Sequence, residues 1–508
     1  MTTVSTTYGK LRGKIDQGAH AYLGVPYAAP PIGTLRYRAP VPPASWADER
    51  DATSFGPVCL QAPMPGLFGE IGTPDNAPGD DCLNLNIWTP GPSATGRPVL
   101  FWIHGGAFFA GSGIDPVYNG ANFARDGVVC VTINYRLGIQ GFAHFADHFP
   151  QLAESGNVGV LDQIAALEWV RDNIAAFGGD PGNVTIAGES AGGMSVGTLM
   201  ATPRAKGLFR RAIPQSGAGH NGLSAPTASM IAGHVLAELG IKPGDLDALL
   251  AVTPEEILTV QIKLNDELGA TRDPARFGDA ASSAMAFQPT FGTDVLPQRP
   301  IDAIAAGAAA GVDVLVGTTL EEALVFIVDM SDLFNEPLVE ATLDMVMAGV
   351  GRSGKTVLDV YRANRPGAAP HELAAAVETD RMFRLPAIRL ADAQAAHNPN
   401  VWMYQFAWRS TVNDGAFGAC HFLEVPFAFD QLHNDQARGI AGAPPQALAD
   451  AVHTAWVKFA TTGDPSHPGL PAWPRWTAAT RPTMRFDLPS TLVLDPAAAE
   501  RKLWDGVV

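Results

Sequence analysis

Short apolar runs separated by glycine-containing loops are the main pattern of this 508-residue chain. The runs that read as strands are residues 99–103, 128–134, 184–187, 211–214 and 312–316. Continuous apolar runs of this length are typical of strands that are buried on both faces of a parallel sheet. Helical periodicity occurs between some of them, as in residues 160–177, where it ends at Gly178 and Gly179. Strands that alternate with helices predict an α/β fold with a large, mostly parallel sheet flanked by helices.

Two later segments have a different pattern. Residues 225–304 and 329–399 are rich in Ala, Leu, Asp and Glu, with helical periodicity and few strand signals. We expect them to be mostly helical insertions that roof the sheet. Residues 64–81 form a Gly/Pro-rich stretch without periodicity, and a loop of this length is often a functional cover. Because no repeat or clear linker divides the chain, we expect residues 1–508 to form a single body.

The charge balance excludes some classes of partner. The formal net charge is -17, and an acidic surface repels nucleic acid and anionic lipid. Residues 1–16 are polar, and no uninterrupted apolar stretch approaches the roughly 18 residues that span a bilayer. The four cysteines lack the paired short spacing of a zinc site. We therefore expect a soluble cytoplasmic protein with no nucleic-acid or membrane partner.

The sequence Gly188-Glu189-Ser190-Ala191-Gly192 follows the predicted strand at 184–187 and precedes a helix-compatible run at 191–200. A Gly-x-Ser-x-Gly turn between a strand and a helix forms a strained elbow that raises the serine hydroxyl to the end of the sheet. The helix amino terminus at this point stabilises negative charge. The context therefore predicts that Ser190 is a nucleophile.

A glycine-rich loop, His104-Gly105-Gly106-Ala107, follows the predicted strand at 99–103. Acyl transfer places negative charge on the former carbonyl oxygen, and each backbone N–H group aimed at it contributes roughly 3 kcal/mol. Small residues let the backbone of such a loop approach a substrate. We predict Gly106, Ala107 and Ala191 as the donors of an oxyanion hole, and we expect His104 to be structural.

A serine nucleophile needs a histidine base. His421 comes after a strand-like run at 401–408 and a small polar loop, which is where a base at the end of a strand is expected. His220, His433 and His467 also lie in predicted loops, so position alone leaves them open.

The histidine in turn needs a carboxylate that fixes its tautomer, and in this type of fold the acid lies between the serine and the histidine. The strand at 312–316 is followed by Gly317-Thr318-Thr319-Leu320-Glu321-Glu322. Spacing does not separate Glu321 from Glu322.

Together these motifs resemble the type-B carboxylesterase family of the α/β-hydrolase fold, which includes cholinesterases and bacterial esterases active on nitrobenzyl esters. The resemblance runs from residues 8–13 to residues 491–495, and residues 177–192 match the serine signature of the family. Residues 80–87 resemble its second signature, with Asn84 where the family usually has Tyr or Thr and Asp80 where Glu is common. Neither departure affects the chemistry.

The resemblance implies assignments that the spacing left open. The acid of the family is the second acidic residue of a Gly-x-x-x-Asp-Glu run, which selects Glu322, although Ala323 follows it where the family has Gly. The base of the family has an acidic residue three positions later, which selects His421 with Glu424.

Other residues match positions around the site of the family. The resemblance implies that Glu189, Ser216 and Glu424 brace the triad. Cys59 and Cys82 fall where the family often has a disulfide, which would close the loop at 64–81 and add roughly 3 kcal/mol if it is oxidised.

The implied activity is hydrolysis of a small-molecule carboxylic ester through an acyl-enzyme on Ser190, without a metal or cofactor. Family members with a Gly-Gly-Ala loop accept esters of bulky alcohols, so the resemblance implies a substrate with a bulky or aromatic alcohol. Cholinesterases carry a choline-stacking Trp in the loop between the residues matching Cys59 and Cys82, and its absence here implies no selectivity for quaternary amines. Two alternatives remain: hydrolysis of a carbamate or aryl amide by the same triad, and a non-catalytic binding protein of the same fold. The oligomeric state is open.

Overall fold

Successive side chains of the central strand β7 (Arg97–Ile103) pack into two different hydrophobic clusters. Phe101 and Ile103 join one cluster, and Leu100 and Trp102 join the other. Because side chains of a strand alternate between the two faces of a sheet, both faces of β7 are buried. This is why the strand reads as an unbroken apolar run.

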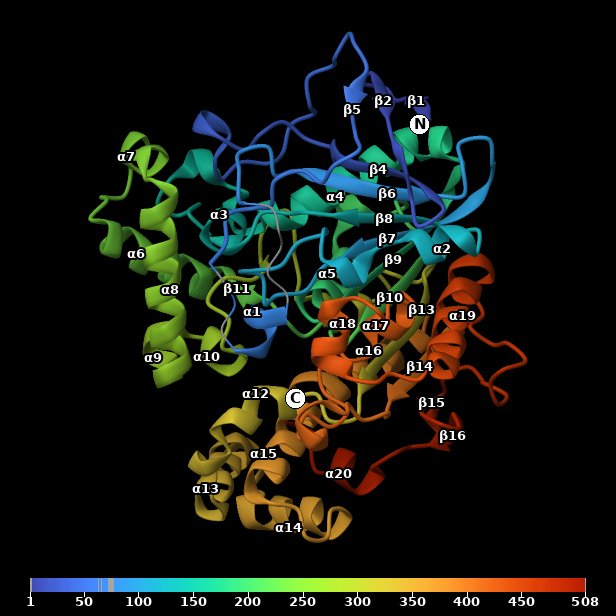
Figure 1. The fold of residues 1–508 in the computed structure, drawn as a ribbon. Helices are drawn as coiled ribbons and strands as arrows, with labels where there is room; N and C mark the ends of the chain where they lie inside the picture. Colours follow the sequence, from blue (N-terminus) through green and yellow to red (C-terminus); the bar gives the residue numbers. More distant parts are fainter. Residues whose placement is uncertain (1, 63, 65, 72–76, 508) are drawn as a thin grey trace.

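The computed structural model of the chain describes residues 2–62, 64, 66–71 and 77–507. Figure 1 shows a large twisted sheet running through the molecule. Its 11 strands lie in the order β16 (Thr491–Leu494), β15 (Pro482–Phe486), β14 (Val401–Phe406), β13 (Asp313–Thr319), β10 (Arg211–Gln215), β9 (Gly179–Glu189), β7, β8 (Val129–Ile133), β6 (Asn84–Thr89), β4 (Ala19–Pro26) and β3 (Lys14–Asp16). Neighbours from β8 to β15 are parallel, whereas β3, β4, β6 and β16 are antiparallel additions at the two edges.

The five runs that the sequence analysis assigned to strands lie in β7, β8, β9, β10 and β13, so the predicted α/β class is confirmed. Two further small sheets are formed by β1 (Thr3–Ser5), β2 (Lys10–Arg12) and β5 (Arg50–Asp51), and by β11 (Leu223–Ser224) and β12 (Thr290–Phe291). The large sheet alone determines where the candidate site lies.

Helices cover both faces of the large sheet. One face packs against α4 (Val158–Asn173), α5 (Ala191–Ala201) and α16 (Leu385–Ala395), and the other against α2 (Ala121–Arg125), α17 (Val425–Ala428) and α19 (Gln446–Thr462). The helix expected at 160–177 is α4 followed by a 3-10 turn at Ile174–Phe177, and Gly178 ends it with φ 88°. No helix in the described ranges is long and apolar enough to cross a bilayer.

The two segments expected to be helical insertions contain most of the other helices. The first holds α6 (Ala225–Leu239), α7 (Leu246–Ala251), α8 (Pro254–Thr271), α9 (Pro274–Phe277), α10 (Ala280–Ser283) and α11 (Pro300–Ala305). The second holds α13 (Glu336–Met347), α14 (Gly354–Asn364), α15 (Pro370–Thr379) and α16, and the short α12 (Leu324–Ile327) precedes it. In Figure 1, α6 to α10 group beside the sheet, and α12 to α15 lie beyond its end together with α20 (Ala498–Lys502). By contrast, α11 and α16 pack against each other within the layer that covers the sheet.

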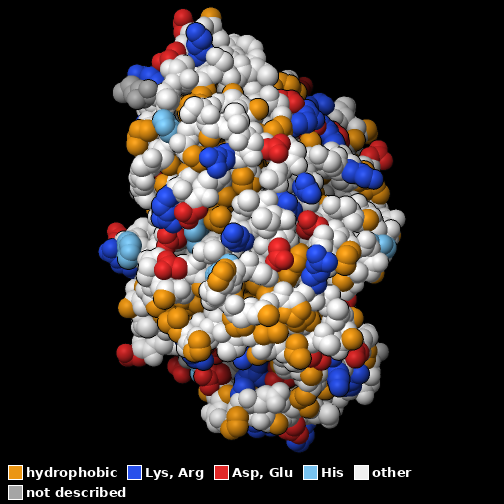
Figure 2. Space-filling view, turned by 90° about the vertical axis from the view of Figure 1, so that its right-hand side faces the viewer, with side chains coloured by type: hydrophobic (Ala, Val, Ile, Leu, Met, Phe, Trp, Pro, Cys, Tyr) orange, Lys and Arg blue, Asp and Glu red, His pale blue; other side chains and the backbone are white. Residues whose placement is uncertain are grey.

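The remaining helices are short: α1 (Leu67–Ile71), α3 (Gly138–Phe142) and α18 (Asp435–Ala441). Helix α1 lies within the stretch 64–81 that was expected to be a loop, and residues 65 and 72–76 of this stretch are outside the described residues. On the face of the molecule seen in Figure 2, Lys and Arg side chains are interspersed with Asp and Glu side chains. Charges of both signs therefore share the described part of that face.

The chain reverses direction at a single residue between β9 and α5. Ser190 lies between them with φ 57° and ψ −123°, a conformation that L-residues rarely adopt. A side chain at Gly188 or Gly192 would place its Cβ atom 2.6 Å or 2.0 Å from the carbonyl oxygen of Ile103 on β7. The elbow therefore packs against the neighbouring strand at a distance that only glycine permits.

The close approach at Gly192 leads to a prediction about stability. We expect Gly192→Ala to lower the free energy of unfolding by about 1–3 kcal/mol, because the added methyl group clashes with backbone that cannot move aside. Chemical denaturation of both proteins measures the difference. The control is Gly269→Ala in α8, where an added Cβ meets no atom within 4 Å and should stabilise by about 0.4–1 kcal/mol. Equal effects of the two substitutions would contradict this account of the elbow.

Candidate active site

The carboxyl ends of three neighbouring parallel strands bring the candidate residues to one edge of the sheet. Gln215, at the end of β10, pairs in register with Glu189 of β9 and with Gly317 of β13. The residues that follow these positions therefore emerge side by side, as they do at the ligand-binding edge of open α/β sheets. They include Ser190 and Glu322.

A short hydrogen bond connects the predicted acid and base. Nδ1 of His421 lies 2.6 Å from Oε2 of Glu322, and the two residues are 4% and 0% exposed. The other carboxylate oxygen accepts hydrogen bonds from Ser216 Oγ at 2.6 Å and from the amide of Thr319 at 2.7 Å. The carboxylate of Glu322 is thus held in one orientation, as is needed to fix the tautomer of a histidine.

Glu321, which sequence spacing did not separate from Glu322, has different surroundings. Its Oε1 atom accepts a hydrogen bond from Arg409 at 2.8 Å, and its Oε2 atom accepts one from the amide of Ala419 at 2.9 Å. It lines a surface hollow of about 830 Å³ together with Arg365 and Arg409. Of the two glutamates, the structure therefore brings only Glu322 to His421.

The second ring nitrogen of His421 faces another carboxylate. Nε2 lies 3.0 Å from Oε1 of Glu189, a close charge contact without the direction of a hydrogen bond. Burial by itself lowers the pKa of His421, but the charges of Glu189 and Glu322 outweigh it and hold the pKa well above its usual value. Within the described part of the chain, the Ser190 hydroxyl forms no hydrogen bond to His421 in this conformation.

Glu424 is a third buried carboxyl group beside the pair. Its Oε1 atom accepts long hydrogen bonds from Gln215 Nε2 at 3.3 Å and Tyr404 Oη at 3.4 Å. Burial raises the pKa of Glu424 to about 8, and repulsion by Glu189 and Glu322 adds to the shift. Glu424 is therefore mainly protonated at pH 7, which limits the negative charge around His421.

The glycine-rich loop predicted to form the oxyanion hole lies against the elbow. A Cβ atom on Gly105 would be 2.8 Å from the backbone oxygen of Glu189 and 3.2 Å from Cβ of Ser190. Gly106 and Ala107 follow with φ values of 104° and 51°, so the loop turns sharply beside the serine. The amide of Ala191 begins α5 on the other side of Ser190.

The ring of His104, which was expected to be structural, contacts Tyr135 and the backbone of the loop. Its ring stacks on Tyr135 at 4.5 Å, and its Nδ1 atom lies 2.8 Å from the backbone oxygen of Gly105. Burial lowers the pKa of His104 to about 4, so it is neutral at pH 7.

Three phenyl rings surround the imidazole, and the sequence analysis did not single out any of them. Ring centroids lie 4.8 Å from His421 for Phe383, 5.3 Å for Phe326 and 6.4 Å for Phe68. Phe326 is 43% exposed, so part of this wall faces solvent. The rings come from segments far apart in the chain, and single phenylalanines in such segments read as ordinary core residues. No pattern in one sequence would have identified them.

Cys59 and Cys82, which fall where the family often has a disulfide, are free thiols in the structure. Both are buried, and Cys59 Sγ lies 3.9 Å from the backbone oxygen of Cys82. Their oxidation stays a prediction. Among the described residues, no three His, Cys, Asp or Glu side chains form a group that could hold a metal ion.

Comparison with known proteins identifies the family of the chain. The model of the carboxylesterase family matches residues 1–504. The para-nitrobenzyl esterase of Bacillus subtilis (strain 168) is 39% identical over 98% of this chain and 97% of its own length, and phenmedipham hydrolase of Pseudarthrobacter oxydans is 37% identical over 97% and 95%. A crystal structure of a Geobacillus stearothermophilus carboxylesterase has 40% identity and a TM-score of 0.86, covering 99% of this chain and all of that one.

The chain therefore belongs to the carboxylesterase family. It has the α/β-hydrolase fold and is a serine hydrolase of carboxylic esters, as the sequence analysis predicted. The comparisons do not favour the carbamate, aryl-amide or non-catalytic alternatives.

The raised pKa of Glu424 leads to a prediction about stability and pH. Between about pH 5 and pH 8 the folded protein keeps a proton on Glu424 that the unfolded chain releases, so stability should fall as the pH rises. Gln has nearly the shape of Glu but does not titrate. We therefore expect Glu424→Gln to make the free energy of unfolding fall less steeply with pH, by up to about 1 kcal/mol per pH unit. Chemical denaturation of both proteins at several pH values measures this pH dependence. If the free energies of unfolding of the two proteins change with pH in the same way, Glu424 is ionised in the folded protein over this whole pH range.

Proposed function

We propose that the chain hydrolyses esters of bulky or aromatic alcohols by two-step acyl transfer, with Ser190 as nucleophile, His421 as base and Glu322 as its orienting acid. The observation that carries this proposal is the buried 2.6 Å hydrogen bond between Glu322 and His421 at the sheet edge where the Ser190 elbow lies. Serine hydrolysis needs this pairing, because the hydroxyl is a poor nucleophile without an oriented base.

In the first step His421 Nε2 takes the Ser190 proton while Oγ attacks the ester carbonyl. This requires Ser190 Oγ to come within hydrogen-bond reach of Nε2, a contact that commonly forms only when substrate is bound. The amides of Gly106, Ala107 and Ala191 hold the oxyanion, and His421 then protonates the leaving alcohol. In the second step His421 activates a water molecule, which releases the acid and restores Ser190.

Glu189 places negative charge beside His421 in both reaction steps. The imidazolium that forms in each step is flanked by Glu322 at Nδ1 and by Glu189 at Nε2. Two carboxylates on one buried ring stabilise its cationic form, and they also raise the pH at which the free base becomes available. The protonated Glu424 contributes no further negative charge.

The aromatic wall supports a bulky or aromatic alcohol as leaving group. Phe68 and Phe326 present rings within 6.4 Å of the ring that protonates this group. Aromatic surfaces favour aromatic partners by about 0.5–1.5 kcal/mol beyond simple burial. The similarity to a para-nitrobenzyl esterase agrees with this choice.

The nucleophile is tested by Ser190→Ala. We expect kcat for p-nitrobenzyl acetate to fall by about 10⁶-fold, because a triad acts as one unit and its loss removes nearly all of the chemical step. Titration of the released acetic acid at constant pH measures the rate, and circular dichroism checks that the variant folds. Turnover that survives the substitution would refute the assignment of Ser190.

The same assay tests the alcohol preference in the unaltered protein. Ethyl acetate has the same acyl group without the aromatic alcohol, and we expect its kcat/KM to be at least about tenfold lower. Equal kcat/KM values for the two esters would show that the aromatic wall does not determine the preferred alcohol. They would not contradict the assignment of the triad.

The role of Glu189 is tested through the pH profile. Removing its charge in Glu189→Gln removes one cause of the raised pKa of His421, so the acidic limb of kcat/KM should move to lower pH by about 1 unit or more. Glu321→Gln is the matched control, because Glu321 faces Arg409 instead of His421. If the acidic limb of kcat/KM lies at the same pH in both variants as in the unaltered protein, the charge of Glu189 does not affect the base.

A further inference from the structure

One turn of π-helix lies between two α-helices next to the candidate site. This turn, η9 (Asp380–Arg384), joins α15 to α16, and the residues on both sides of it keep helical backbone angles. A π-turn holds one more residue than an α-turn, so it rotates the side chains after it relative to those before it. Such turns are frequently found at functional sites.

The turn contacts the candidate base, and the residue before the turn contacts the loop that carries the acid. Phe383 is 3% exposed, and its ring is the nearest of the three to the imidazole, 4.8 Å from centroid to centroid with 42° between the planes. Immediately before the turn, Thr379 Oγ1 at the end of α15 accepts a hydrogen bond of 3.1 Å from the amide of Ala323, the residue after Glu322. The turn and the residue before it therefore lie against the base and the loop of the acid.

A buried polar network holds the turn in place. Asp380 and Arg384 form a bidentate ion pair with distances of 2.5 Å and 2.7 Å, and Tyr361 Oη donates to Asp380 at 2.6 Å. Trp504, near the end of the chain, donates to Tyr361 Oη at 2.9 Å.

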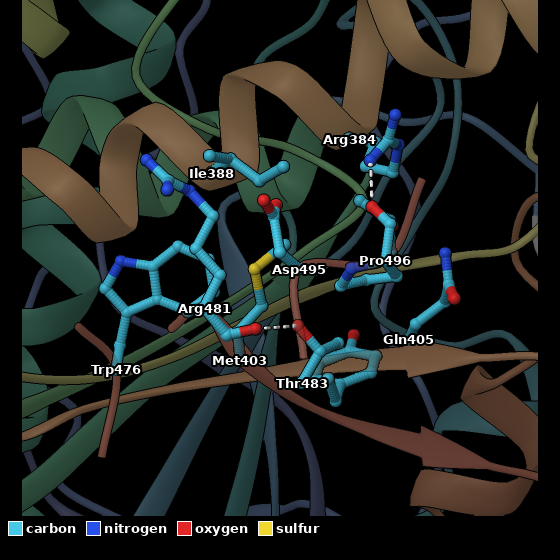
Figure 3. Close-up of a pocket in the computed structure, with 11 residues that line it drawn as sticks. Arg384, Ile388, Met403, Gln405, Trp476, Arg481, Thr483, Asp495 and Pro496 are labelled. Carbon is cyan, nitrogen blue, oxygen red and sulfur yellow. Dashed lines mark hydrogen bonds between the residues drawn. The ribbon is translucent and has the colours of Figure 1, made fainter. Parts of the chain in front are cut away.

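Figure 3 shows the other contact, in which Arg384 donates to the backbone oxygen of Pro496 beside a cavity of about 10 Å³. Helix α14 and the C-terminal segment thus fix the π-turn from outside.

We propose that Phe383 is a positioning residue that keeps the imidazole of His421 in the plane needed for proton transfer. This inference rests on the proposed function. The hydrogen bond at Nδ1 anchors one corner of the ring but does not stop the ring from tilting about that bond. A phenyl ring packed against the imidazole removes this freedom, and the network around Asp380 and Arg384 keeps the phenyl ring in place.

The alternative is that Phe383 only lines the pocket for the substrate. The two roles differ in a measurable way. A pocket wall affects KM and the preference for large substrates, whereas a positioning residue affects the chemical step with every substrate. A small fluorophosphonate makes the distinction, because it needs an activated Ser190 and barely touches the pocket walls.

The experiment compares Phe383→Ala, Phe383→Leu and Arg381→Gln with the unaltered protein. Arg381 lies on the same turn but pairs with Glu378, which makes its variant a control for damage to the helix. We expect Phe383→Ala to slow fluorophosphonate labelling of Ser190 and to lower kcat by about 10- to 100-fold, because small misplacement of a catalytic group has effects of this size. KM should change by less than kcat. Phe383→Leu, which refills most of the volume, should recover part of the rate, and Arg381→Gln should keep it.

Two results would overturn the proposal: labelling of Phe383→Ala at the unaltered rate, and an equal loss in Arg381→Gln. If Phe383→Ala fails to fold in a thermal unfolding scan, Phe383→Leu decides, and normal labelling of that folded variant also counts against the proposal. Failure of the proposed function gives a different result, since the unaltered protein would then resist the fluorophosphonate.

Discussion

The candidate site depends on one buried hydrogen bond, that between Glu322 and His421. A charge-assisted bond away from water is strong, but burying its partners is costly unless every remaining polar atom is satisfied. Here the cost is limited in two ways. Ser216 and the Thr319 amide satisfy the other oxygen of Glu322, and Glu424 stays protonated, so the imidazole does not face three full charges. The parallel strands provide the rigid edge on which these groups meet.

Much of the fold is encoded in local pattern. Strands buried on both faces leave unbroken apolar runs, which is why β7, β8, β9, β10 and β13 could be located from sequence. A strand followed by Gly-x-Ser-x-Gly and a helix identifies the elbow at Ser190. The edge strand β3 was harder to find, because its 3 residues are too few for a period to emerge. The short helix α1 in an expected loop was missed for the same reason.

The site was predictable only in part, because its assembly depends on contacts between distant segments. Glu321 and Glu322 are adjacent in sequence, and only the turn after β13 decides which of them meets His421 and which meets Arg409. Resemblance to a family supplied that choice, while spacing could not. Neither spacing nor the family resemblance identified the phenyl rings or the π-turn. A Phe beside a catalytic ring cannot be distinguished by its local sequence from a Phe in a hydrophobic core. The cytoplasmic location and the cysteine pairing remain predictions.

The tight packing of the elbow has a consequence for how such a protein can diversify. Gly105, Gly188 and Gly192 lie so close to neighbouring backbone that side chains there have no room, and this freezes the part that carries the chemistry. The rings of Phe68 and Phe326 stand on α1 and α12, outside the sheet, where exchanges leave the strands undisturbed. New substrates can thus be reached by drift in these outer helices while the reaction itself is inherited unchanged.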